Sequence, residues 1–456
     1  CDSTDIAKNG TGTGKVLTDT PYIYNKQDKV LIAAMDGGTF TMESGLIDTA
    51  SSIADNANDG QFAVSVQNEH ADATVIINGG HIKAGWYAVA GNGTDVNYNG
   101  NITVNGGILE SVADYAIYHP HAGTTTVNGG VIFGAAGGIS INRGKLIVND
   151  GTITSKGTGT TGNWGDGTGN QQAAAINVNA AYEATAVEIK GGKITAEKDA
   201  ILLTNGRDGT VAVSGGTFSS EVKPEYCAEG FVPVRNTEDG TYGVKVAPVA
   251  KIGTVEYATL NEAFAAAKDG ETVLLLTDTE LTDYITVDKA VTLDLGGKTV
   301  TANLTSNYAF AVTADVTFKN GAINITNNNG GISVAGKLTL VDVDITGAAV
   351  NAPLLYLIGS TETTIDKDST VTATSSSANS YPAILMEGSY ADETITLNIY
   401  GSVSCKSMPA VQGNGADKAT SKINVYDGAS VTSEKLAMYL PQICEVNISG
   451  GLVDGY

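Results

Sequence analysis

The sequence is poor in proline, aromatic residues and arginine. It has nine prolines, 6% aromatic residues and three arginines among 456 residues. Its formal net charge is −23, so its surface repels nucleic acids and anionic membranes, and we expect no nucleic-acid partner. No apolar run reaches the roughly 18 residues that a membrane-spanning helix requires. We expect no cofactor, and Ca²⁺ is the one ion that such acidity could collect.

Cysteine is also scarce. Only Cys1, Cys227, Cys405 and Cys444 are present, too few for a disulfide scaffold in a chain of this length. Cys405 and Cys444 are 39 residues apart, which in a stack of repeats is two rungs, or about 9–10 Å. A disulfide requires Cα atoms within about 7 Å. We therefore expect free, buried thiols.

The first residue, Cys1, has a separate interpretation. A cysteine at a mature N-terminus, followed by a polar tether, is typical of a bacterial lipoprotein whose thiol carries the lipid. Cys1 is followed by the polar stretch 2–14. Cys1 is therefore a candidate lipid anchor to a membrane, and the alternative is an arbitrary boundary of the sequence.

Glycine, in contrast, is abundant, with 56 residues against an average of about 7%. Many glycines belong to a repeated motif of a polar residue, one or two glycines and a hydrophobic residue, as in 78–82. From Gly80 to Gly216, the last glycines of successive copies are 27, 23, 21, 41 and 24 residues apart. Short stretches with period-two alternation lie between the motifs, such as 102–104 and 187–189, and they predict half-buried strands.

This repeat predicts an all-β fold, a parallel β-helix. A single coil of this length cannot bury its own inner face. Coils must therefore stack about 4.8 Å apart, which pairs every strand with the next rung and lines up Val, Ile and Leu inside. The signatures of leucine-rich repeats and of propellers are missing.

The pattern changes near residue 226 and indicates two β-helical sections in tandem. A tether and first strand (1–29) precede a first β-helix with a closing hairpin (30–246). A second β-helix (247–456) follows, and we expect its chain to continue beyond Tyr456, because the last motif stops in mid-coil. A short amphipathic helix over 259–269 should cover the open end of the second section. Thr259 and Glu262 have the spacing of a capping box.

The helix segment 257–263, the closing strand 239–244 and the Gly-Gly turns resemble the pectate-lyase-like modules of bacterial cell-surface, adhesin-like proteins. The resemblance covers most of residues 30–456 and implies a right-handed solenoid that is extracellular or on the bacterial surface. Such modules occur in adhesins, in scaffolds and in polysaccharide lyases and hydrolases, so the resemblance leaves the function open.

Aromatic residues are the candidate ligand-binding groups. Trp86 and Tyr87 lie one coil before Tyr115 and Tyr118, and Trp164 lies in the long Gly/Thr-rich loop behind the 41-residue spacing. Loops on rigid scaffolds often carry binding, and aromatic faces stack on sugars. The alternative is that these rings stack on one another for stability.

Three other patterns could carry chemistry, and the alternative for each is a solvated turn or strand face. They are the alternating carboxylates Asp342 and Asp344, the pair Arg143 and Lys145, and His119 and His121 with His81 as a third metal ligand. Glycoside hydrolysis needs two carboxylates roughly 5–10 Å apart, and zinc needs at least three protein ligands. We assign no catalytic residue and no metal ligand.

The leading hypothesis is a non-enzymatic, secreted or surface-anchored bacterial adhesin or scaffold. Its stiff β-helical rod would present loops that bind a glycan or a host or cell-surface protein. One alternative is a polysaccharide lyase or glycoside hydrolase of the pectate-lyase-like type. Another alternative is a structural stalk or filament subunit.

Overall fold

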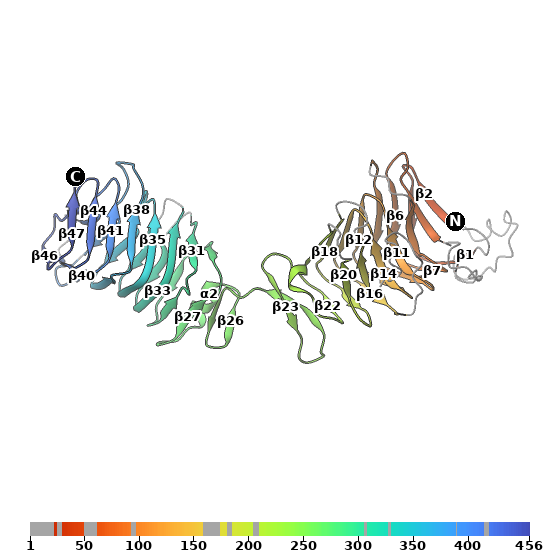
Figure 1. Ribbon diagram of the computed structural model, residues 1–456, viewed down its shortest axis with the longest axis horizontal. Helices are drawn as coiled ribbons and strands as arrows, with labels where there is room; N and C mark the ends of the chain where they lie inside the picture. The colour runs from red at the N-terminus through yellow and green to blue at the C-terminus, as the bar shows by residue number, and fades with distance from the viewer. Residues whose placement is uncertain are drawn as a thin grey trace. The chain divides into compact units, whose positions relative to one another are not determined.

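The computed structural model divides the chain into two compact units, Cys1–Ala247 and Pro248–Tyr456, both drawn in Figure 1. Each unit is a stack of parallel strands, so the expected parallel β-helix is confirmed. The structure describes residues 22–24, 30–49, 62–92, 97–157, 174–179, 185–203, 209–304, 308–326, 330–388, 390–414 and 419–456.

In the first unit each full coil contributes one strand to each of three sheets. The first sheet contains β1 (Tyr22–Tyr24), β4 (Leu46–Asp48), β7 (His81–Ala84), β10 (Ile108–Ser111), β13 (Val131–Gly134), β16 (Thr152–Ser155), β19 (Lys193–Thr195) and β22 (Thr217–Phe218). The second contains β2 (Val30–Met35), β5 (Phe62–Gln67), β8 (Val89–Asn92), β11 (Tyr115–His119), β14 (Gly137–Ile141), β17 (Ile176–Val178) and β20 (Ile201–Leu203). The third contains β3 (Thr39–Met42), β6 (Ala73–Ile77), β9 (Gly100–Val104), β12 (Thr124–Val127), β15 (Lys145–Val148), β18 (Thr185–Ile189) and β21 (Gly209–Val213).

The second unit has one large sheet with two arms and one smaller sheet. One arm contains β27 (Thr272–Leu275), β30 (Thr292–Asp294), β37 (Thr361–Ile365), β40 (Thr394–Ile399), β43 (Thr420–Val425) and β46 (Cys444–Ile448). The other contains β28 (Thr279–Leu281), β31 (Thr299–Ala302), β38 (Thr370–Ala373), β41 (Ser402–Cys405), β44 (Ser430–Ser433) and β47 (Leu452–Gly455). The long strands β33 (Asp315–Ile325) and β35 (Lys337–Gly347) run through both arms. The smaller sheet contains β29 (Ile285–Val287), β32 (Tyr308–Val312), β34 (Gly330–Val334), β36 (Leu355–Ile358), β39 (Ile384–Glu387), β42 (Val411–Gly413) and β45 (Met438–Tyr439).

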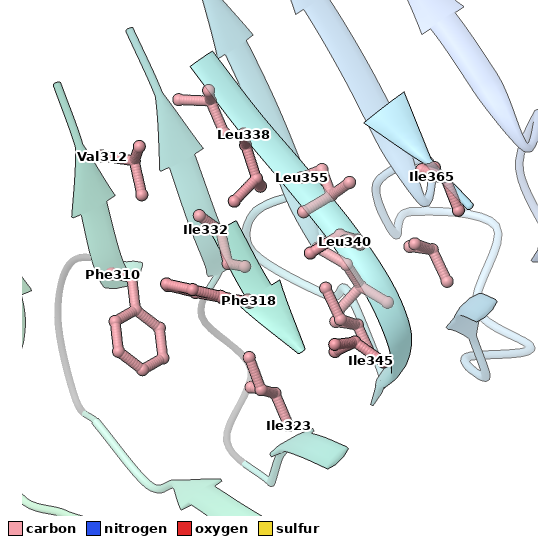
Figure 2. Close-up of a cluster of buried hydrophobic side chains, with 14 of the residues drawn as sticks. Phe310, Val312, Phe318, Ile323, Ile332, Leu338, Leu340, Ile345, Leu355 and Ile365 are labelled. Atoms are coloured by element: carbon pink, nitrogen blue, oxygen red, sulfur yellow. The ribbon is translucent and has the colours of Figure 1, made fainter. Parts of the chain in front are cut away.

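Parallel in-register pairing builds the core of each unit as columns of like residues. In the first unit Val89, Ile117, Ile139 and Ile176 pair directly from rung to rung, and all are fully buried. In the second unit the inward side chains of neighbouring strands point into one shared interior, as Figure 2 shows around Phe318 and Leu340. Each coil thus buries its apolar face against the next, as the period of the repeat predicts.

The ends of the two stacks that lie nearest in sequence are closed by other elements. After β22 come the 3₁₀ turn η2 (Pro224–Tyr226) and an antiparallel hairpin of β23 (Phe231–Arg235) and β24 (Tyr242–Val246). This hairpin pairs with β22 and lies where the sequence predicts a closing hairpin. At the start of the second unit β25 (Ala250–Ile252) and β26 (Val255–Tyr257) form a hairpin, and α2 (Leu260–Ala266) packs beside it. No helix among the described residues is long and apolar enough to cross a membrane.

The capping box at the start of α2 is confirmed. The Thr259 side chain accepts a hydrogen bond from the Glu262 amide, and the Glu262 side chain accepts one from the Thr259 amide. The predicted helix end at residue 269 is wrong, because Ala267 already has extended backbone. Ala267 is buried in the core, and Gly270 donates from its amide to Ala290 O at 2.7 Å. The chain therefore leaves the helix early to join the first rung.

The Gly-Gly turns place glycine where the backbones of successive rungs meet. The last glycine of the motif has positive φ in all six copies from Gly80 to Gly216, for example +82° at Gly107. Beside these turns Asn78, Asn105 and Asn128 form an amide ladder, in which Asn105 and Asn128 each donate to the preceding asparagine at 2.8 Å. Glycine allows the turn, and the ladder joins it to its neighbours.

We predict that Gly107→Ala destabilises the first unit by roughly 2–4 kcal/mol. An added Cβ would lie 2.8 Å from the carbonyl carbon of Gly79 and from Gly80 O, and alanine would also adopt an unfavourable positive φ. Thermal unfolding followed by circular dichroism measures the loss.

Gly37→Ala is the matched control for this prediction. Gly37 has φ +83°, but nothing lies within 4 Å of its added Cβ. Gly37→Ala should therefore lose stability only through backbone strain, by roughly 1–2 kcal/mol. Equal losses in the two variants would show that contact between rungs does not require glycine at position 107.

Candidate functional site

Four of the predicted ligand-binding residues meet in one aromatic cluster of the first unit. Trp86 and Tyr87 stack with ring centroids 4.6 Å apart, and Tyr87 stacks on Tyr118 at 5.0 Å. Phe62 packs against both Trp86 and Tyr87, and Tyr115 belongs to the same buried cluster. The one-coil spacing in the sequence thus correctly predicts that these residues come together.

Asp114 is the polar centre of this aromatic cluster, and sequence reasoning did not single it out. One of its carboxylate oxygens accepts from Trp86 Nε1 at 2.7 Å and from the Tyr87 hydroxyl at 3.4 Å. The other oxygen accepts from the Tyr115 amide at 2.9 Å. Burial raises the pKa of Asp114 to about 6, although these hydrogen bonds act in the opposite direction.

The aromatic cluster is largely closed to solvent. Trp86, Tyr87 and Tyr115 are 9%, 5% and 1% exposed, and Tyr118 is half-buried. These rings therefore stack on one another around Asp114. Ligand binding by them stays a prediction, and Trp164 lies outside the described residues.

The histidines do not form the triad that a metal site would need. His119 and His121 are buried side by side with ring centroids 4.4 Å apart. His81 instead lies on β7 and contacts Glu110 at 3.1 Å. Burial lowers the pKa of His119 well below its usual value and that of His121 to about 4. Among the described residues no group of three His, Cys, Asp or Glu side chains could hold a metal ion.

The described cysteines are free, as expected, but only one of them is buried. Cys405 is buried, whereas Cys227 and Cys444 are partly exposed, which corrects the expectation of three buried thiols. Cys227 follows η2 beyond the last full coil of the first unit, and Cys444 begins β46, the last strand of its arm among the described residues. Cys405 and Cys444 lie on different arms of the sheet. Cys1 lies outside the described residues.

A more accessible aromatic group lies on the smaller sheet of the second unit. This tyrosine face consists of Tyr308 on β32, Tyr356 on β36, Tyr381 just before β39 and Glu387 at the end of β39. The rings of Tyr308 and Tyr356 stack with centroids 5.6 Å apart and planes within 11°. The Tyr356 hydroxyl donates to Glu387 Oε2. Tyr381 is 40% exposed, and the other three are half-buried.

The surroundings keep the tyrosine face rigid and its phenols protonated. The ring of Tyr308 lies over Gly330, where an added Cβ would come within 2.2 Å of it. Burial raises the pKa of Tyr356, and the hydrogen bond to Glu387 raises it further. Burial also raises the pKa of Tyr308, and the neighbouring phenols of Tyr356 and Tyr381 raise it further. In the sequence, Tyr308 precedes an Ala and an apolar residue, as Tyr87 and Tyr115 do, and this repeat is the signal that could have marked it.

A polar hollow of about 290 Å³ lies on the large sheet of the second unit. Its lining includes Lys298, Thr299, Asn320, Asp342 and Asp344. Asp342 and Asp344 both point outward from β35, as their alternation predicts. Lys298 and Asn320 were not recognised from the sequence.

Comparison of the chain with protein-family models, with curated proteins and with solved structures found no match.

We predict that His121→Gln makes the protein less sensitive to acid. Below about pH 6.5 an unfolded histidine binds a proton, whereas folded His121 does so only near its pKa of about 4. The neutral ring therefore favours folding above pH 6.5, and this stability is lost as the pH falls towards 4. The variant should reduce that loss by about 3 kcal/mol, measured by denaturant unfolding from pH 7.5 to 4.

The slope against pH separates this effect from any change in packing, because each variant is compared with its own stability at pH 7.5. Asp114 acts in the opposite direction, since its raised pKa of about 6 lets the folded state bind a proton first. His81→Gln leaves both buried rings in place and is the control. An unchanged slope in His121→Gln would contradict the prediction.

Proposed function

We propose that the chain is a secreted or surface-anchored bacterial binding scaffold of the adhesin type, whose ligand is a glycan. The observation that carries the proposal is the tyrosine face. It combines two stacked rings, a third exposed ring and a carboxylate on one rigid sheet. Aromatic faces with a few placed polar groups are typical of ligand sites, and sugars offer both apolar C–H faces and hydroxyl groups.

The carboxylate chemistry of the described residues also supports binding rather than catalysis. Asp114 is the one described carboxyl group with a clearly raised pKa, and its oxygens already accept from Trp86, Tyr87 and the Tyr115 amide. A general acid must be able to reach the bond that it protonates. Asp114 is 3% exposed, so it serves the aromatic cluster.

The alternative of a polysaccharide lyase or hydrolase is favoured by one observation, the position of Asp342 and Asp344 at the polar hollow. New reducing ends or unsaturated products from a polysaccharide panel, with Ca²⁺ and with chelator, would support the enzyme. Their loss in both Asp342→Asn and Asp344→Asn would assign the chemistry to these two carboxylates. The further alternative, a stalk or filament subunit, predicts neither binding nor cleavage.

We predict that Tyr356→Ala lowers glycan affinity at least tenfold, because it removes one ring of the stack and the donor to Glu387. Tyrosine is enriched among the few residues of a binding site whose truncation costs about 2 kcal/mol or more. Retention of the full chain on an immobilised panel of plant, bacterial and mucin glycans measures the change.

Tyr426→Ala is the matched control, since Tyr426 also stacks on a tyrosine, Tyr400, with centroids 4.0 Å apart and planes within 3°. This pair lies at turns of the large sheet, away from the tyrosine face. Wild-type retention in both variants would mean that the tyrosine face is not the binding site. A wild-type chain that binds no glycan on the panel would contradict the proposed function itself.

A further inference from the structure

One arm of the large sheet in the second unit carries two straight rows of hydroxyl groups. Thr370, Ser402 and Ser430 pair in register on β38, β41 and β44, and two residues further along so do Thr372, Ser404 and Thr432. These six residues are the hydroxyl rows. Rungs of a parallel sheet are about 4.8 Å apart, and alternate residues of a strand about 6.6 Å apart. The surface is therefore a regular grid of groups that both donate and accept hydrogen bonds.

The hydroxyl rows are uncharged, whereas the other arm has one charged row and one row of hydrogen-bonded Thr and Asn side chains, in which Asn424 donates to Asn398 at 2.8 Å. On the other arm Lys337 pairs with Glu362 at 3.1 Å and Lys422 with Glu445 at 3.7 Å. Charged pairs already satisfy one another there. Within the hydroxyl rows, Ser404 donates a hydrogen bond to Thr372 at 3.2 Å.

The hydroxyl rows continue into the polar hollow. Thr370 donates from its hydroxyl to Asp344 Oδ1 at 2.6 Å. Asp344 occupies the same position on the preceding rung and lines the hollow. A ligand that follows the rows therefore reaches Asp344 and then the hollow.

The backbone at the hollow is unusual. Asn320 and Asp342 have φ of +60° and +57°, and they are two of the three non-glycine residues with positive φ in the described part of the chain. Both are held by hydrogen bonds, from Gly297 N to Asn320 O at 2.7 Å and from Asp342 N to Asp366 Oδ1 at 3.1 Å. Side chains held in such conformations are concentrated at ligand sites.

The chemistry of this surface selects one class of ligand. Sugar hydroxyls donate to the carboxylates of Asp342 and Asp344 and accept from Lys298 and from the rows. An acidic polymer would meet those carboxylates and a chain of net charge −23. A linear polysaccharide presents a similar set of hydroxyls on each successive ring, and the rows repeat on each successive rung.

We propose that the polar hollow and the hydroxyl rows together bind an extended, neutral polysaccharide, with one end in the hollow. This inference rests on the proposed glycan-binding function and adds a second site to it, on a different sheet from the tyrosine face.

Affinity electrophoresis of the full chain tests the second site. Native gels contain xyloglucan, galactomannan or polygalacturonate as the probe. We expect at least one neutral polysaccharide to retard the wild-type chain, and polygalacturonate not to. The double variant Asp344→Ala/Thr370→Ala should bind at least tenfold more weakly, because it removes the junction of hollow and rows. Circular dichroism verifies that the variant is folded.

Thr396→Ala is the matched control. Thr396 is a half-buried threonine on β40, in the other arm of the large sheet, so this variant should bind as the wild type does. Full binding by the double variant, or binding abolished by Tyr356→Ala alone, would overturn the second site and leave the proposed function standing. Retardation by polygalacturonate alone would overturn the neutral ligand. If none of the three polysaccharides retards the wild-type chain, the second site is contradicted. The proposed function is contradicted only if the wild-type chain also binds nothing on the immobilised glycan panel.

Discussion

The main-chain pairing between successive rungs is the constraint on which both units depend. Because the strands are parallel and in register, each residue lies directly over its equivalent in the next coil. A single residue choice, once repeated, becomes a column or a row. The buried Ile117–Ile139–Ile176 column, the asparagine ladder at Asn105 and the hydroxyl rows at Ser402 all follow from this one geometry.

The same constraint explains how much of the fold could be predicted. The Gly-Gly turns and the alternating strands depend on local sequence, so their period was sufficient to predict the stack. The capping box of Thr259 and Glu262 was equally local. The end of α2 was not, because Ala267 leaves the helix for contacts with a rung that lies further along the chain. The partial exposure of Cys227 likewise depends on where the first stack gives way to η2 and the hairpin.

The candidate sites were harder to predict for physical reasons. Spacing alone placed Trp86 near Tyr115, but the polar centre of the cluster is Asp114, which accepts hydrogen bonds from Trp86 and Tyr87 one coil earlier in the chain. Tyr308 and Tyr356 stack although the glycine rung of Gly330 lies between them. The Asn320-Gly321 pair is a local signal for the positive φ at Asn320, but residues of β31, β33 and β35 line the polar hollow together, and no local pattern predicts that meeting.

Rigidity connects the fold with binding. Ordering a side chain on association costs about 0.5–1.5 kcal/mol, and in a solenoid much of that cost is already met during folding. Glu387 holds the Tyr356 phenol, and Asp344 holds the Thr370 hydroxyl, before any ligand arrives. Each contact with a sugar is weak, so affinity must come from many contacts made together. A repeating ligand on a repeating surface meets this requirement, since every additional rung adds one more prepositioned set of groups.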